Sequence, residues 1–264
     1  MAIDPNTAKV QSVGNPDFWQ TGYAVNPAAY IAIQALSELW EPLRQKEVDD
    51  EVPVAIGRMM DVSFKSLHAV VNLTLNGFGS DAVRIVRSMW EYEITSSYLR
   101  LHPELVTDYN DFIYVCMAEE YDFLLEKGPD LLTNRSPEIA AQIQAALKAA
   151  ERFRRKGRLP NSWKDVSIKK MAEETGRADV YRTVYRWGSG HVHGDITSIF
   201  AVFDVGNGHV DVGPSVKGID LALRTAHHAQ LSLMMDFNEE GQRGFDTDLE
   251  IAKNTFLQAW TPLP

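Results

Sequence analysis

The chain is poor in cysteine and has no long apolar run. Cys116 is the one cysteine among 264 residues, so no intramolecular disulfide can form and zinc sites with several sulfur ligands are excluded. No segment approaches the roughly eighteen apolar residues of a membrane-spanning helix, and residues 1–7 lack the apolar core of a signal peptide. We therefore expect a cytoplasmic protein in a reducing compartment, with no membrane partner.

Common signatures of catalysis and phosphate binding are also missing. The chain has no G-x-S-x-G nucleophile motif, no Walker motif and no G-x-G-x-x-G loop, and we expect no cofactor. Cys116 lies in an apolar helical segment and is expected to be inert. The formal net charge of −10 argues against a surface that binds nucleic acid or anionic membranes in general, but it leaves room for a local basic site. Nothing signals DNA specificity.

Apolar residues recur mostly at helical spacing, and capping signals delimit the segments. The predicted helices are residues 27–46, 53–76, 81–101, 103–128, 136–155, 180–193, 218–240 and 247–260. Residues 199–212 alternate with period two around a glycine-rich turn, which predicts a small β-hairpin. Because no linker or internal repeat separates these segments, the sequence predicts a mainly α fold: an N-terminal extension over residues 1–25 and a single helical-bundle domain over residues 26–264.

The segment from residue 185 to residue 195 is the densest in groups that move or bind protons. It contains Tyr185, Arg186, Ser189, His191, His193 and Asp195. On a helix, Tyr185, Ser189 and His193 share one face at four-residue spacing, and Arg186 nearly coincides with His193. The glycines at positions 188 and 190 each cost a helix about 1 kcal/mol, which indicates a bend or a close backbone approach.

A second polar pair lies on the predicted helix 81–101. Its apolar stripe consists of Val83, Val86, Trp90, Ile94 and Leu101, and Arg87 falls inside the stripe with Glu91 at its edge. Charges on an apolar face need partners, so the two residues either form a structural ion pair or contribute to a ligand or phosphate site. We expect this helix to pack on the helix 180–193, with Arg87 or Glu91 in hydrogen-bond reach of Tyr185, Ser189 or His193.

Residues 151–170 are strongly basic within an acidic chain. Eight lysines and arginines, Arg155 and Lys156 among them, stand against two acidic residues. One interpretation is a solvated helix end whose cations complement the helix dipole. The other is a strip that contacts phosphate beside the segment 185–195.

These motifs resemble a known pattern. R-x3-E at Arg87 and Glu91, followed by Y-x3-S-x3-H from Tyr185 to His193, resembles an uncharacterised bacterial and phage family of domains of unknown function, over roughly residues 55–240. That family is similar in organisation to the HEPN group (higher eukaryotes and prokaryotes nucleotide-binding), whose helical bundles often dimerise.

The resemblance implies an activity. Catalytic HEPN proteins are metal-independent RNases, frequently toxins or antiviral defence factors, marked by Arg-x4-6-His. Arg186 with either His191 or His193 satisfies this spacing. The resemblance thus implies a homodimer that binds RNA or a nucleotide, in which Arg186 contacts phosphate, His191 and His193 transfer protons, and Arg87, Glu91, Tyr185, Ser189, Asp195, Arg155 and Lys156 assist in binding or support.

Two other interpretations stay open. A non-catalytic helical module that binds a nucleotide, RNA or a protein would use the same residues without cleavage. A metallohydrolase would use the triplet His191, His193 and Asp195, although Ile196 stands where the metallo-β-lactamase motif needs another histidine. Further ligands would then come from His209, His227 or His228, although the pair 227–228 is typical of a partly exposed polar helix face.

Overall fold

The computed structural model describes most of the chain. The described residues are 16–45, 49–128, 136–155, 159–160, 162–163, 166–193, 203–204, 209–210 and 213–260. None of the described helices is long and apolar enough to cross a membrane.

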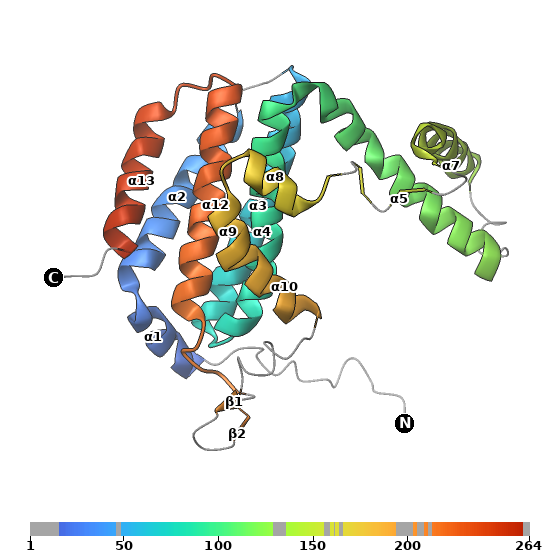
Figure 1. Ribbon diagram of the computed structural model, residues 1–264. Coiled ribbons are helices and arrows are strands. Elements are labelled where there is room, and N and C mark those ends of the chain that lie inside the picture. The colour runs from blue at the N-terminus through green and yellow to red at the C-terminus, as the bar shows by residue number, and fades with distance from the viewer. Residues whose placement is uncertain are drawn as a thin grey trace.

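The described part is mainly helical, which confirms that the protein is mainly α (Figure 1). Its α-helices are α1 (Pro16–Val25), α2 (Pro27–Gln45), α3 (Glu51–Leu75), α4 (Gly79–Leu101), α5 (Val106–Lys127), α7 (Pro137–Ala150), α8 (Ile168–Glu174), α9 (Ala178–Val180), α10 (Arg186–His193), α12 (Ile219–Glu240) and α13 (Asp246–Trp260). Short 3-10 helices η1 (Pro103–Leu105) and η2 (Glu151–Phe153) and a π-helical turn η3 (Tyr181–Tyr185) connect them.

The bundle is centred on α3, α4 and α12, with α2 and α13 packed outside them (Figure 1). Small side chains such as Ala82, Ala222 and Ala226 are fully buried between these helices, which lets the helix backbones approach closely. The starts of α4 and α12 nearly touch, because a β-carbon on Gly79 would lie 2.4 Å from the backbone nitrogen of Ile219. Large buried side chains such as Trp90 then fill the remaining space.

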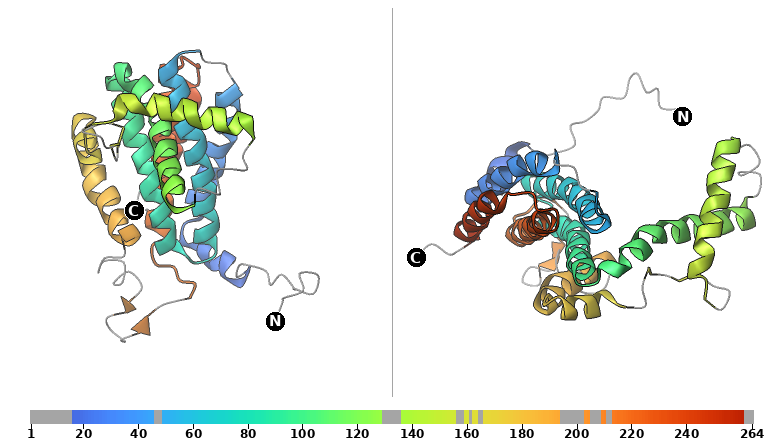
Figure 2. Two further views of the ribbon diagram at one scale, coloured as in Figure 1. Left: turned by 90° about the vertical axis from the view of Figure 1, so that its right-hand side faces the viewer. Right: turned by 90° about the horizontal axis from the view of Figure 1, so that it is seen from above.

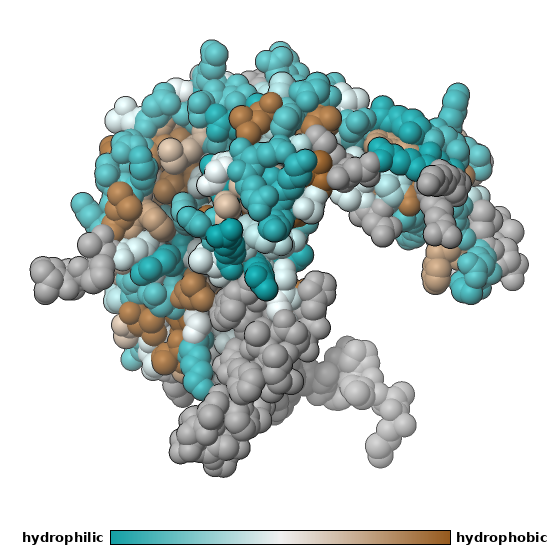
Figure 3. Space-filling view, in the orientation of Figure 1, coloured by the Kyte–Doolittle hydropathy of each residue, from teal (hydrophilic) through white to brown (hydrophobic). Residues whose placement is uncertain are grey.

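Helices α5 and α7 form an arm that leaves the bundle, and α7 crosses α5 (Figure 2). The arm has a small core of its own around Val115, Ala118 and Ala150. Ser136 caps α7 by accepting a hydrogen bond from the backbone N–H of Ile139 at 3.4 Å, as the sequence predicted. The surface of the arm is largely hydrophilic in the view of Figure 3.

Several helices begin or end at residues other than those predicted from the sequence. Helix α4 begins at Gly79, two residues before the predicted start at residue 81, and Leu101 is 57% exposed, so it does not belong to the buried stripe. Helix α7 ends at residue 150, before the 3-10 turn η2, instead of running to 155. Residues 16–25 of the expected extension form α1, which packs on α2 and α3.

The structure describes a short strand pair within the predicted hairpin. Strands β1 (Phe203–Asp204) and β2 (His209–Val210) pair antiparallel, while the rest of the predicted hairpin lies outside the described residues.

Helix α8 occupies the end of the basic segment, where Ser167 caps it by accepting from the backbone N–H of Lys170 at 3.3 Å. From α8 the chain runs through α9 and η3 to α10, along one side of α4.

Candidate functional site

The expected contact between α4 and α10 is confirmed, and Arg87 is at its centre. The Nε of Arg87 donates to the hydroxyl of Ser189 at 2.9 Å, and its Nη2 donates to the hydroxyl of Tyr185 at 2.8 Å. Its Nη1 lies 3.5 Å from Oε2 of Glu91. Because two donors of one guanidinium bond to Tyr185 and Ser189 at once, Arg87 fixes the position of α10 on α4.

Gly188 allows this close approach. A β-carbon at this position would lie 3.0 Å from the β-carbon of Arg87 and 3.5 Å from the carbonyl oxygen of Val83. The glycine therefore serves the packing of α10 against α4, and the segment 186–193 is nevertheless a regular α-helix. The sequence indicated a close approach at this glycine, and the structure identifies α4 as the neighbour.

Arg87, Glu91, Tyr185 and Ser189 form the Arg87 cluster, and Glu91 is its most exposed charged member. The Tyr185 hydroxyl donates to its Oε2 at 3.5 Å, a long and weak hydrogen bond, and the Glu91 side chain is 40% exposed. Burial, with the nearby Glu91 carboxylate, raises the pKa of Tyr185 in spite of Arg87. The Tyr185 hydroxyl therefore stays protonated at neutral pH. It accepts a hydrogen bond from Arg87 and donates one to Glu91.

Arg186 lies at the start of α10 with its side chain exposed. It makes no hydrogen bond or ion pair with a described side chain. Position 193 is seven residues further along the same helix, so the backbone places the two positions on one side of α10. The side chains of His191 and His193, and all of Asp195, lie outside the described residues.

A cleft of about 580 Å³ opens beside Glu91. It lies between α4, α5 and the segment that leads into α8, and it is lined mainly by aromatic and hydroxyl side chains. Its lining residues are Ser88, Glu91, Tyr92, Thr95, Tyr109, Phe112, Ser162, Trp163, Val166, Ser167, Ile168 and Met171. Sequence reasoning found only Glu91 of this set.

A smaller pocket of about 200 Å³ shares Ser162 and Trp163 with the cleft and contains Arg152 and Arg155. Arg152 bridges Asp108 at 2.9 Å and Asp111 at 3.0 Å across α5. The described part of the basic segment is thus largely paired with carboxylates of the arm and of α8. Lys156 lies outside the described residues.

The residues offered for a metal site are not brought together where the structure describes them. No group of three or more histidine, cysteine, aspartate or glutamate side chains that could hold a metal occurs among the described residues. The expectation of a partly exposed pair at 227–228 was wrong for His227, which is fully buried and whose pKa burial lowers to about 4. Its ring is therefore neutral at physiological pH and belongs to the core.

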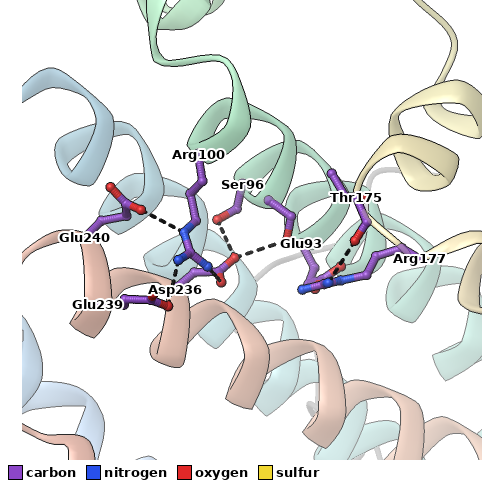
Figure 4. Close-up of polar contacts among 9 residues, drawn as sticks. Glu93, Ser96, Arg100, Thr175, Arg177, Asp236, Glu239 and Glu240 are labelled. Carbon is purple, nitrogen blue, oxygen red and sulfur yellow. Dashed lines mark hydrogen bonds and ion pairs between the residues drawn. The ribbon is translucent and has the colours of Figure 1, made fainter.

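A buried polar network on α4 escaped sequence reasoning altogether (Figure 4). Glu93 is fully buried and accepts from Nε of Arg177 at 2.8 Å. Burial raises the pKa of Glu93 to about 7, although Arg177 opposes the shift. Asp236 of α12 lies beside it, accepts from Ser96 at 3.0 Å and pairs with Arg100.

Arg100 completes the network at its exposed end. It also pairs with Glu239 at 2.6 Å and with Glu240 at 2.9 Å. The network thus ties α4 to α12 and to the turn before α9, and it sets two arginines against four carboxylates. A signal for it was present in the sequence, since Glu93, Ser96, Ser97 and Arg100 are polar residues within a single long helix.

Comparison with family models identifies where this chain belongs. Residues 54–210 match the model described as a family of unknown function, DUF5677. The chain belongs to this family. The matched region includes α4, the arm and α10, so the DUF5677 match contains the whole Arg87 cluster and the cleft, whereas α12 and α13 lie beyond it. No curated protein and no solved structure matches the chain.

Proposed function

We propose that this DUF5677 protein binds RNA along α10 and cleaves it without a metal, as the HEPN resemblance implies. The observation that carries the proposal is the exposed Arg186 on a helix that Arg87 anchors from another side. A guanidinium held on a rigid helix suits two phosphate oxygens, because its planar donors match their geometry.

The chemistry follows from the residue types. Attack of an RNA 2′-hydroxyl on the adjacent phosphate needs a base, an acid for the leaving 5′-oxygen and a cation for the developing negative charge. Imidazoles with pKa near neutrality suit the two proton transfers, and we assign these roles to His191 and His193. Arg186 supplies the cation. Asp195 remains in the proposal as a supporting residue.

The proposal includes a homodimer in the cytoplasm, in which two copies of α10 face one another and supply two sets of these side chains. It also includes a role as a toxin or antiviral factor. Sedimentation of the purified chain tests the dimer. Growth arrest after induced expression in bacteria, absent in the His193→Ala variant, tests the toxin role.

The decisive experiment is incubation of the purified full chain with total RNA in the presence of EDTA. Cleavage is expected in the parent and is expected to be lost in His193→Ala and strongly reduced in Arg186→Lys, because an ammonium cannot form the planar two-point contact. Arg182→Lys is the matched control, since Arg182 is exposed one turn earlier and should tolerate the change. Cleavage that persists in both site variants, or that chelation abolishes, contradicts the mechanism.

The cleft favours a second candidate, a non-catalytic module that binds a nucleotide or RNA. Its volume is in the range of small-molecule sites, which run from roughly 300 to 1,000 Å³. Binding of RNA by the parent without any cleavage would favour this module. Absence of both binding and cleavage would reject both candidates and leave a protein-binding role.

A further inference from the structure

The cleft beside Glu91 has flat aromatic walls. Tyr109 and Trp163 meet edge to face, with ring centroids 5.4 Å apart and an interplanar angle of 84°. Tyr92 and Phe112 line the same space. Burial raises the pKa of Tyr109 to about 12, so its hydroxyl is uncharged at neutral pH. A planar ligand can therefore stack on one of these two rings, while the other ring and hydroxyl groups contact its edge.

Among the described residues that line this cleft, Glu91 is the only charged one. Its two described contacts both reach Oε2 at 3.5 Å, from Arg87 and from Tyr185, and neither is a strong hydrogen bond. The carboxylate therefore keeps acceptor capacity toward the cleft. Because Arg87 already balances its charge, a neutral ligand with N–H donors fits this carboxylate better than a second cation does.

The adjoining pocket adds two guanidinium groups. Its lining contains Arg152 and Arg155 beside Asp108, and Trp163 is a wall that it shares with the cleft. A ligand with a planar neutral head in the cleft and an anionic tail in this pocket matches both linings. A nucleotide has this division between base and phosphate.

The donor pattern selects the base. A single carboxylate accepts two parallel hydrogen bonds, and guanine presents two adjacent donors, N1–H and the N2 amino group, on one edge. Adenine and cytosine place an acceptor beside their amino group, and uracil flanks its one N–H with carbonyl oxygens. We propose that the cleft binds a guanine base, with Glu91 accepting from N1 and N2 and the Trp163 ring stacking on the base.

The inference rests on the proposed function only for the source of the base, which is either RNA or a free guanine nucleotide. The chemistry at Glu91 is the same for both. Calorimetric titration of the purified full chain with GMP, AMP and IMP therefore tests it without any cleavage assay. IMP is the sharpest probe, because it keeps N1–H and lacks the N2 amino group.

GMP is expected to bind at least 10-fold tighter than AMP, and about 10-fold tighter than IMP, since one donor of a bidentate pair is lost. In Glu91→Gln the preference for GMP over AMP is expected to disappear, because the amide offers one acceptor and one donor. Asp81→Asn is the matched control: it removes a carboxylate from an exposed site on the same helix and should leave the preference intact.

A second variant guards against a folding defect in Glu91→Gln. Trp163→Leu removes a stacking wall away from the Arg87 cluster and should weaken GMP binding about 10-fold or more, with unchanged circular dichroism. GMP and AMP bound equally, or neither bound, overturns the inference.

Relative affinities identify the source of the base, and the cleavage assay tests the proposed RNase function separately. A short RNA containing guanosine that binds tighter than GMP identifies RNA as the source, whereas GMP bound tighter identifies the free nucleotide. GMP preference in a protein that cleaves no RNA upholds the guanine site and rejects the RNase proposal.

Discussion

Helix α4 carries charged pairs at three depths, and their surroundings differ more than their residue types do. Arg84 and Asp81 are each 50% exposed. Arg87 and Glu91, a turn further on, are 20% and 40% exposed and face α10 and the cleft. Glu93 is fully buried and faces Arg177, while Arg100 reaches the buried Asp236.

The buried network and the Arg87 cluster differ in whether a ligand can reach their carboxylates. In the buried network, Glu93 and Asp236 each have an arginine beside them, and a ligand has no access to Glu93. The Arg87 cluster is rigid on the α10 side and leaves Glu91 weakly bonded toward an open cleft. Rigid support on one side with unused acceptor capacity on the other is what a binding site requires.

The largest expected effect comes from leaving the buried carboxylate without its cation. Arg177→Met keeps the apolar stem and removes the guanidinium, so the free energy of unfolding at pH 8 should fall by about 3–5 kcal/mol. Urea unfolding measures this loss. The double variant with Glu93→Gln should recover much of the stability, since no buried charge is then left unpaired. Exposed ion pairs contribute up to about 1 kcal/mol to the free energy of unfolding. If Arg177→Met lowers it by less than this, burial does not increase the contribution of the Glu93–Arg177 pair to stability.

The stability of the buried network is expected to depend on pH. The pKa of Glu93 is about 7 in the folded protein against an ordinary 4.5, so the folded state binds more protons between these values. The contribution of Glu93 to stability is therefore greatest below about pH 4.5, falls as pH rises to about 7, and is constant above, a change on the order of 1–3 kcal/mol. Unfolding curves of the parent and of Glu93→Gln at pH 5 to 8 should differ by this slope. Parallel curves would contradict the raised pKa.

An intermediate effect is expected from the half-buried cluster. Arg87→Met removes the hydrogen bonds to Tyr185 and Ser189 and should lower the free energy of unfolding by about 1–3 kcal/mol. Backbone amides of α10 should also exchange hydrogen faster, because the helix loses its anchor. Arg87→Lys should recover less than half of the loss, since an ammonium does not span both hydroxyls as the guanidinium does. Unchanged exchange in α10 would show that other contacts position this helix.

The smallest effect is expected at the exposed pair. Arg84→Ala should change the free energy of unfolding by less than about 0.5 kcal/mol, because its contact with Asp81 at 3.2 Å is solvated and screened. The same urea unfolding measurement provides the check. A loss as large as that of Arg87→Met would break the ordering by depth.

Sequence reasoning reached the Arg87 cluster because its pattern is local. Arg87 and Glu91 are one turn apart on a helix, as are Tyr185 and Ser189, and each pair interrupts an otherwise apolar face. Two such helices with unsatisfied polar groups had reason to meet. Glu93 was missed because residues 93–99 are buried on every side of α4, so the helix has no single apolar stripe there. Periodicity identifies a buried face and gives no warning of a helix enclosed on all sides.

Local patterns predicted the helical class, most helix ends and the contact of Arg87 with α10, because spacing, capping residues and unsatisfied polar groups are properties of short segments. Which charges are buried, and where a cleft opens, depend on the tertiary structure. The partner of Glu93 is 84 residues away at Arg177. The cleft collects side chains from α4, α5 and the segment before α8. Such assemblies depend on how helices cross, and crossing is set by the packing of the whole core rather than by any local pattern.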